Sequence, residues 1–522
     1  MKIAIDPTPF ERLIEKYGLR RSWIYALATH VKESAPRFHY ILESPLFSKA
    51  KFLPQNHLSN LTIGEIGVLY EYSVALSDPE SRRGNGQFFT PDDVAIFMTQ
   101  QTQNRKFKGG SWLDPCSGIG NLSWHLVNAQ FDKEDFLKTK LTLSDRDDLA
   151  LEIARVLFTL SFQNKYPNLY HEIANRFVKF DFLSVADNGN PALISEPEIS
   201  KIPEHDFVIV NPPYLGLKAD DPRFETSKAR DLYAYFLENV IKTSSGFVSI
   251  TPQSFTNAQK FQPLRRLILG KYKSIRIYSF DNIPGNIFYG VKFGSENSNK
   301  ANSIRAAITI AHTNKGAIET TSLMRWKTSE REQMFKSLDK FLTPGDLSED
   351  YFPKVSAIFS HLFFEMKSQR KLGELVSSKK SQYALYIPAA PRYFISALKR
   401  PVARTSMKTI HFANQEDLDT AYLALNSSLM YWWWRVRDGG MTLSLESITS
   451  LPLPQFVVDP NLVRDLEKSE KSNVVTKRNA GALHENVKHD LALVQRLNEL
   501  IVPSFADRLL LTHGNSELIQ LN

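Results

Sequence analysis

Residues 112–121, WLDPCSGIGN, join a short apolar run to a turn that contains two glycines. Similar apolar runs follow along the chain, and each ends in a polar turn or in a turn with glycine or proline. They are LTLSD at 141–145, FVKFD at 177–181, DFVIVNPP at 206–213 and GFVSITP at 246–252. Runs of this kind that alternate with helical patterns are typical of buried parallel strands. The sequence therefore predicts an α/β fold: a mostly parallel sheet with helices on both faces and a ligand site at the carboxyl ends of the strands.

Length and composition restrict the class of protein. The chain has 522 residues, whereas single hydrophobic cores stop growing near roughly 250 to 300 residues, so at least two domains are expected. Hydrophobic residues at 42% and charged residues at 23% are ordinary for a globular protein and exclude a disordered or fibrous class. No apolar run is long enough to cross a bilayer and no signal peptide is recognisable, so we expect no membrane partner and a cytoplasmic location.

Cysteine content and charge add two limits. Cys116 is the single cysteine, which excludes an intrachain disulfide and a Cys-rich zinc site, and we expect no metal. The formal net charge of +8 would favour a polyanionic partner if the excess cations are clustered.

The glycine turn and the next strand end carry candidate ligand contacts. Gly118 and Gly120 would let the backbone pass close to a ligand, while helix amide groups from Asn121 onward offer donors. By itself this turn is equally compatible with a simple strand-to-helix connection. Asp145 ends the next run, where a carboxylate could accept hydrogen bonds from both hydroxyls of a ribose. The nearby Asp147 is expected to cap a helix or lie at the surface, as is its neighbour Asp148.

The run that ends in NPPY, residues 211–214, is the most specific motif. Two consecutive prolines hold the backbone rigid. The amino nitrogen of adenine is a poor nucleophile, because its lone pair is delocalised into the ring. If the Asn211 side-chain oxygen and the Pro212 carbonyl accept its two N–H bonds, the nitrogen moves toward tetrahedral geometry and exposes the lone pair. Pro213 completes the rigid pair, and Tyr214 would stack on a flipped base.

These motifs, in this order, resemble the gamma group of amino-methyltransferases, the TaqI-type DNA adenine methylases. DPCSGIGN at 114–121 and NPPY are preceded by GQFFTP at 86–91. The resemblance implies a Rossmann-like S-adenosylmethionine-dependent methyltransferase domain and a mixed α+β target-recognition domain. It further implies a restriction-modification enzyme that methylates the N6 amine of an adenine flipped out of duplex DNA. A separately encoded cognate restriction endonuclease is one candidate partner.

The resemblance also assigns roles to residues. Asp145 would hold the ribose of S-adenosyl-L-methionine, and Asp181 with Phe182 would hold its adenine, although each of these two also fits a helix cap or a core position. Phe288, in FDNIPGNIF at 280–288, would stack on the target base opposite Tyr214. The remaining residues expected to line the cofactor pocket are Phe88, Thr90, Pro91, Asp114, Pro115, Gly118 and Gly120.

The sequence predicts four segments. Residues 1–58 form an N-terminal helical region, 59–298 the methyltransferase domain, 299–456 the target-recognition domain and 457–522 a C-terminal helical tail. The boundary near 298 rests on a stretch rich in Ser, Asn and Gly at 295–302, after which the alternation of strands and helices fades.

The recognition segment contains a basic stretch interleaved with aromatic residues. Such a stretch suits phosphate contacts, which position a protein on DNA without specifying sequence, but it also fits an ordinary solvated surface. The tryptophans at 432–434 are expected to pack in the core. The residues expected to bind DNA are Lys379, Lys380, Arg392, Lys399 and Arg400.

Several alternatives stay open. The same NPPY chemistry serves methyltransferases that act on RNA or on a protein glutamine. A fused restriction nuclease needs metal-binding acids of the D…E-x-K type, and the only E-x-K is 365–367, without a convincing upstream acid. A non-catalytic DNA-binding specificity subunit would have lost Asn211, Tyr214 or Gly118, and all three are present.

Overall fold

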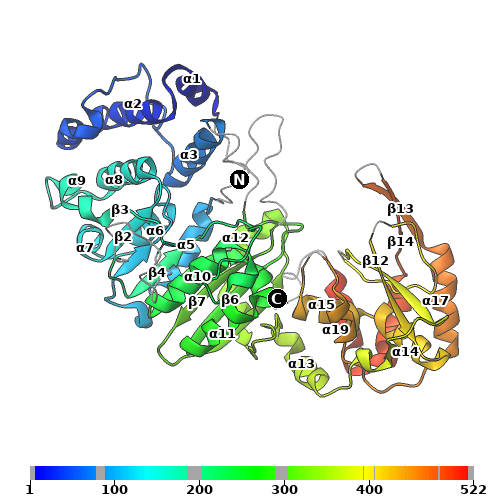
Figure 1. The fold of residues 1–522 in the computed structure, drawn as a ribbon. Coiled ribbons are helices and arrows are strands. Elements are labelled where there is room, and N and C mark those ends of the chain that lie inside the picture. The colour runs from blue at the N-terminus through cyan, green and yellow to red at the C-terminus, as the bar shows by residue number, and fades with distance from the viewer. Residues whose placement is uncertain are drawn as a thin grey trace. The chain divides into compact units, whose positions relative to one another are not determined.

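The computed structural model describes residues 6–77, 89–184, 203–288, 304–391, 393–404, 406–440, 442–479 and 482–514 (Figure 1). Phe88 and Arg392, both named above, lie outside the described residues. The chain forms two compact units. The first unit comprises residues 1–255, 259–277 and 286–318, and the second comprises 256–258, 278–285 and 319–522. The predicted methyltransferase segment therefore falls mainly in the first unit, and the predicted recognition segment and tail fall in the second.

The first unit begins with helices that pack on its sheet domain. The helical patterns near the N-terminus correspond to α1 (Thr8–Tyr17), α2 (Leu19–Lys32) and α3 (Ile63–Ser77). Their apolar faces share one cluster of buried side chains with α8 (Asp148–Phe162), a helix that contacts β2 and β3. The N-terminal helices are thus part of the same compact unit as the sheet.

Each predicted strand of the sheet is present. They are β1 (Trp112–Asp114), β2 (Leu141–Asp145), β3 (Phe177–Lys179), β4 (Phe207–Val210) and β5 (Gly246–Pro252). These strands are all parallel and lie in the order β3-β2-β1-β4-β5. Side chains of β4 are all buried, as expected for an apolar strand in a parallel sheet. The predicted α/β fold class with a mostly parallel sheet is confirmed.

The sheet continues beyond the boundary that the sequence suggested near residue 298. β7 (Ala306–His312) pairs antiparallel with β5 along its full length, from Gly246 opposite His312 to Pro252 opposite Ala306. In the strand order β7 precedes β6 (Ser274–Phe280), although β6 comes first along the chain. The alternation fades in the sequence because β7 runs antiparallel to β5, and antiparallel strands need no crossover helix.

Helices cover the sheet of the first unit. α6 contacts β4, α7 contacts β2, and α5 and α10 both contact β5. The bounds of the remaining helices are α5 (Asp92–Gln101), α6 (Asn121–Asn128), α7 (Lys133–Thr139), α9 (Leu169–Glu172), α10 (Leu232–Thr243) and α11 (Gln262–Lys271). As expected, Asp147 caps α8: its carboxylate accepts from the amides of Leu149 and Ala150.

The second unit contains small sheets and a helical core, whereas its strands β8 and β9 belong to the large sheet that also contains β1 to β7. Its strands are β8 (Ile318–Met324), β9 (Thr343–Pro344), β10 (Val376–Ser377), β11 (Ala384–Pro388), β12 (Met407–Phe412), β13 (Val474–Asn479) and β14 (Ala482–Val487). Its helices are α12 (Arg331–Ser337), α13 (Ser360–Lys367), α14 (Gln415–Asn426), α15 (Ser428–Arg437), α16 (Leu445–Thr449), α17 (Pro460–Ser472), α18 (Leu491–Ile501) and α19 (Ala506–Leu510).

The core of the second unit is built around α15. Trp432, Trp433 and Trp434 are at most 4% exposed and belong to one large apolar cluster, which confirms their predicted packing role. Helices α17 and α18 lie in the predicted C-terminal helical tail. The hairpin of β13 and β14, orange in Figure 1, was not expected from the sequence, which indicated a charged and then helical tail.

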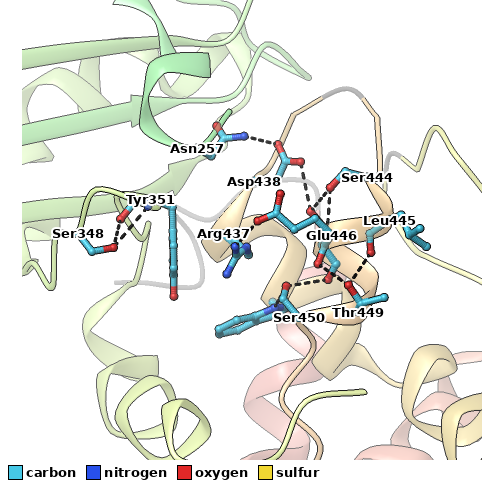
Figure 2. A network of polar contacts seen from close by, with 12 residues as sticks. Asn257, Ser348, Tyr351, Arg437, Asp438, Ser444, Leu445, Glu446, Thr449 and Ser450 are labelled. Carbon is cyan, nitrogen blue, oxygen red and sulfur yellow. Dashed lines mark hydrogen bonds and ion pairs between the residues drawn. The ribbon is translucent and has the colours of Figure 1, made fainter. Parts of the chain in front are cut away.

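A polar network fixes the loop that follows α15 in the second unit (Figure 2). One carboxylate oxygen of Asp438 accepts from the Asn257 side-chain amide at 2.9 Å and from the Gly440 backbone amide at 2.9 Å. Arg437 donates to Glu446 at 2.6 Å, and its guanidinium lies 4.5 Å from the ring centre of Tyr351. Asn257 follows β5 closely, so this network ties a segment that leaves the sheet to a loop 181 residues further along.

Candidate active site

The first unit has a switch point in its strand order between β1 and β4. These strands are parallel neighbours, with Trp112 opposite Phe207 and Leu113 opposite Val208. β2 and β3 lie to one side of β1, while β5 lies on the far side of β4. Open α/β sheets bind ligands at such a point, in the crevice outside the carboxyl ends of the strands. The glycine turn leaves β1 here and the NPPY loop leaves β4 here.

The glycine turn needs both of its glycines, for different reasons. Gly118 and Gly120 have φ values of +53° and +86°, in the left-handed region that favours glycine. A Cβ on Gly120 would lie 2.8 Å from a ring carbon of Phe158. A Cβ on Gly118 would meet nothing within 4 Å. Gly120 thus allows close packing against α8, whereas Gly118 borders open space.

That open space is a cavity of about 480 Å³ within the first unit. Several residues predicted to contact cofactor or target line this cavity: Thr90, Asp114, Pro115, Gly118, Asp145, Asp181, Phe182, Asn211 and Pro213. Pro91 lies just before α5, at its N-cap position, and Gly120 packs against Phe158. Phe89, adjacent to the predicted Phe88, also lines the cavity.

Two aspartates at strand ends face this cavity. Asp114 is 1% exposed and accepts a hydrogen bond from the Ser123 hydroxyl at 2.8 Å. Burial raises the pKa of Asp114 to about 7, and the nearby Asp145 adds to the shift. Asp145 accepts from the backbone amide of Gly118 at 2.8 Å and from that of Asp147 at 3.0 Å. Burial also raises the pKa of Asp145. A cationic ligand group would favour the ionised form of both carboxyls.

Sequence reasoning missed Glu71 of α3. This residue lines the same cavity, and burial raises its pKa to about 7. The signal was an acid in the middle of an otherwise apolar helix, a position where charged residues are uncommon without a partner or a role. Glu71 thus joins the acids that line this cavity, Asp114 and Asp145 among them.

The NPPY loop is tied to the GQFFTP segment. The side-chain nitrogen of Asn211 donates to the Thr90 hydroxyl at 2.9 Å, across 121 residues of sequence. The Tyr214 hydroxyl lies 2.7 Å from the Asn211 side-chain oxygen and 2.9 Å from the carbonyl oxygen of Ile250 on β5. The Cys116 thiol donates to the backbone carbonyl of Asn211 at 3.3 Å. These contacts fix the plane and the direction of the Asn211 amide at the edge of the cavity.

The two aromatic residues expected to hold a target base are neighbours. The ring centres of Tyr214 and Phe288 are 6.1 Å apart, and their planes make an angle of 64°. Phe288 is 2% exposed. The rings therefore meet edge to face, and a base could be held between parallel rings only after at least one of them turns. On the cofactor side, Phe182 is buried and packs against Phe236, with ring centres 5.6 Å apart.

The basic residues predicted to bind DNA differ in their exposure and in their partners. Lys379 and Lys380 are exposed, in the connection between β10 and β11. Lys399 instead contacts Asp419 and Glu467, each at 2.7 Å, so its charge is already balanced inside the unit. Arg400 is exposed and donates to the backbone carbonyl of Glu470 at 2.9 Å.

Within the described ranges, no group of three or more His, Cys, Asp or Glu side chains is arranged to hold a metal ion. No helix in the described part of the chain combines the length and apolar character that a bilayer crossing requires.

Part of the chain is similar to known proteins. Residues 140–288 match the model of the Eco57I restriction-modification methylase family. The type II methyltransferase M.BsuBI of Bacillus subtilis is 25% identical over 207 residues, which are 38% of this chain and 39% of that protein. The matched part of the chain thus spans well under half of that relative's length.

Solved structures also resemble the chain. The complex of DrdV with DNA is 14% identical and matches with a TM-score of 0.44, covering 64% of this chain and 38% of that chain. A type I restriction-modification methyltransferase subunit from Streptococcus thermophilus is 18% identical and matches with a TM-score of 0.34, covering 65% and 68%. The segment that matches the family model, residues 140–288, runs from β2 through the NPPY loop to Phe288 and so contains much of the site. The family model and the Bacillus relative each match only part of the chain.

Proposed function

We propose that the protein is a site-specific DNA methyltransferase that transfers a methyl group from S-adenosyl-L-methionine to the N6 amine of an adenine flipped out of duplex DNA. The observation that carries the proposal is the fixed amide of Asn211 at the edge of the cavity, held between the Thr90 hydroxyl and the Tyr214 hydroxyl. A separately encoded restriction endonuclease is a proposed partner of the same system.

The cavity fits the cofactor in size and in chemistry. Its volume of about 480 Å³ lies within the roughly 300 to 1,000 Å³ of small-molecule sites. Asp145 offers carboxylate oxygens to ribose hydroxyls, and Phe182 offers an aromatic wall to the adenine ring. The carboxyls of Glu71 and Asp114 suit the cationic groups of the cofactor. When bound, S-adenosylmethionine supplies an electrophilic methyl group on a positively charged sulfur.

The role of the chain is to position and activate the amine. A carbonyl oxygen has two lone pairs, so the Asn211 oxygen can accept from the Tyr214 hydroxyl and from the target amine together. The Pro212 carbonyl accepts the second N–H of the amine. Because both acceptors belong to one rigid dipeptide, the nitrogen is drawn toward tetrahedral geometry without reorganisation at the moment of transfer. Tyr214 and Phe288 replace part of the stacking that the base loses on leaving the duplex.

The test is methyl transfer itself. Full-length protein is incubated with S-adenosylmethionine labelled in the methyl group in three separate reactions. One contains unmethylated duplex DNA, one transfer RNA and one a protein extract. Acceptor DNA is then digested to nucleosides and separated. We expect label in N6-methyldeoxyadenosine. Label in the RNA or protein arm alone would reject DNA as the substrate, and label in a methylated cytosine would reject adenine as the base.

A further inference from the structure

A second cavity of the first unit, of about 440 Å³, is lined mainly by cations. Its charged lining residues are Lys228, Arg230, Lys260 and a single acid, Asp220. Arg230 and Asp220 form an ion pair at 2.5 Å. Lys260 donates to the backbone carbonyl of Ala229 at 2.8 Å. This acceptor is neutral, so the contact does not compensate the positive charge of Lys260. The lining therefore has an excess of positive charge.

This cavity is joined to the NPPY loop by backbone hydrogen bonds. The amide of Leu217 donates to the carbonyl of Arg230 at 2.8 Å, and the amide of Leu232 donates to that of Leu215 at 3.0 Å. Gly216 and Asp231 form an antiparallel bridge between these two contacts. Leu215 directly follows Tyr214, so Arg230 lies on the segment paired with the exit of the NPPY loop. Lys228 lies two residues before Arg230, and Lys260 reaches the same cavity from residues 259–261.

The loop that presents these cations is firmly held. The fully buried carboxylate of Glu238 accepts from the backbone amides of Glu225 and Thr226, at 3.0 and 2.8 Å. Phe224 stacks on Tyr235 with ring centres 4.4 Å apart and an interplanar angle of 3°. Arg230 has φ +48°, a left-handed backbone conformation that residues other than glycine rarely adopt. Strain of this kind persists only where the surroundings impose it and tends to cluster at functional sites.

One further acid lies near this surface. The charge of Lys260 lowers the pKa of Asp231, but burial has the larger effect and raises this pKa to about 6. Counting Asp220 and an ionised Asp231 against Lys228, Arg230 and Lys260 still leaves one positive charge in excess. A monoanion held by several donors matches this balance.

We propose that this cavity binds a backbone phosphate of duplex DNA next to the everted adenine. The inference rests on the proposed function and deepens it. A nucleotide pulled out of the stack carries its flanking phosphodiesters with it, so a loop that receives the base must also accommodate at least one of them. Arginine and lysine contacts to phosphate fix the register of a protein on DNA without reading its sequence. Lys228 and Arg230 are exposed, Arg230 is held by Asp220, and Lys260 supports the loop.

The test is the salt dependence of DNA binding by full-length protein. A labelled mixed-sequence duplex oligonucleotide is titrated at several salt concentrations with wild type, Lys228→Gln and Asp220→Asn. Each phosphate contact contributes about 0.9 to the slope of log K against log salt concentration. We expect Lys228→Gln to lower the magnitude of this slope by up to about that amount and to weaken binding. Asp220→Asn frees Arg230 from its ion pair, and we expect it to tighten binding.

Lys108→Gln is the matched control. Lys108 is an exposed lysine just before β1, at the amino edge of the sheet and away from the site, so its removal should leave the slope unchanged. If wild type methylates DNA but Lys228→Gln and Asp220→Asn both bind as wild type does, the phosphate site is rejected and the proposed function stands. If wild type transfers no label to DNA, the proposed function fails. Equal weakening by Lys228→Gln and Lys108→Gln would show a general charge effect and also reject the site.

Discussion

At the scale of single residues, the site depends on how one amide is held. Asn211 is bonded to Thr90 through its nitrogen and to Tyr214 through its oxygen, and its backbone carbonyl accepts from Cys116. An amide fixed on both sides does not need to reorient when an amine arrives. Such preorganised acceptors and donors are the largest contribution to catalysis in many enzymes.

We expect Asn211→Ala to lower kcat by a factor of about 100 to 1,000, the usual effect of removing one preorganised group. Cofactor affinity should change little, because other lining residues of the cavity, Asp145 and Phe182 among them, are the ones assigned to the cofactor. The measurement combines methyl transfer to DNA with the Kd for S-adenosylmethionine. An Asn211→Ala protein that turned over normally but bound cofactor poorly would contradict the assigned role.

The two glycines of the turn give a paired prediction. Gly118→Ala should lower cofactor affinity with a modest loss of stability, about 1 to 2 kcal/mol for the left-handed backbone, because its Cβ points into open space. Gly120→Ala should destabilise the fold more, since its Cβ would lie within 3.0 Å of Phe158 and Leu143 side-chain atoms. Thermal unfolding and cofactor titration of both variants separate the effects. Equal losses of stability would show that the turn is not divided in this way.

At the scale of elements, β1 and α3 each deliver a carboxyl with a raised pKa to the same cavity. The pKa of Asp114 and that of Glu71 are both raised to about 7 by burial. In the free protein, each acid stabilises the fold below its unfolded pKa of about 4, and this contribution is lost as pH rises through 7. A bound cation reverses the preference, because it favours the ionised carboxylates.

We therefore expect the affinity for S-adenosylmethionine to rise between about pH 6 and pH 8, around the raised pKa values of about 7. Binding should release protons, which calorimetry in buffers of different ionisation enthalpy detects. Glu71→Gln should weaken binding at high pH more than at low pH and reduce the proton release. S-adenosylhomocysteine, which lacks the sulfonium charge, should show a weaker pH dependence. An affinity that is flat across this range would mean that these carboxyls do not face the cationic groups.

At the scale of the whole molecule, each compact unit is made of several separate segments of the chain. Residues 256–258 and 278–285 belong with the second unit, although the first unit continues to residue 318. Within the second unit, Asp281 contacts both Arg325 and Arg435, at 3.5 and 3.0 Å, and all three side chains are nearly inaccessible. The segment 278–285 thus supplies a buried carboxylate, that of Asp281, to the second unit.

A pair of fragments tests this organisation. Residues 1–298 end at the sequence-based boundary and lack β7, whereas residues 1–318 include it. β7 pairs with all seven residues of β5 and is buried throughout. We expect fragment 1–318 to show the more cooperative thermal transition by circular dichroism and to retain cofactor binding. Fragment 1–298 should expose the edge of β5 and aggregate. Identical melting curves would show that β7 contributes nothing to the unit.

The sequence by itself determined the elements whose signals are local. Strands β1 to β5, the helical character of the N-terminal region, the Asp147 cap and the packing of the tryptophans in α15 followed from apolar periodicity and turn residues, which span only a few positions. The loops at the carboxyl edge were predicted for the same reason, since parallel strands bring their ends together. The tertiary structure alone decided which loops meet. It placed β7 beside β5, joined Thr90 to Asn211, turned Glu71 into the cavity, gave Lys399 two acidic partners and formed the hairpin of β13 and β14. These contacts bridge chain segments whose relative placement depends on the whole fold, and no single stretch of sequence contains that information.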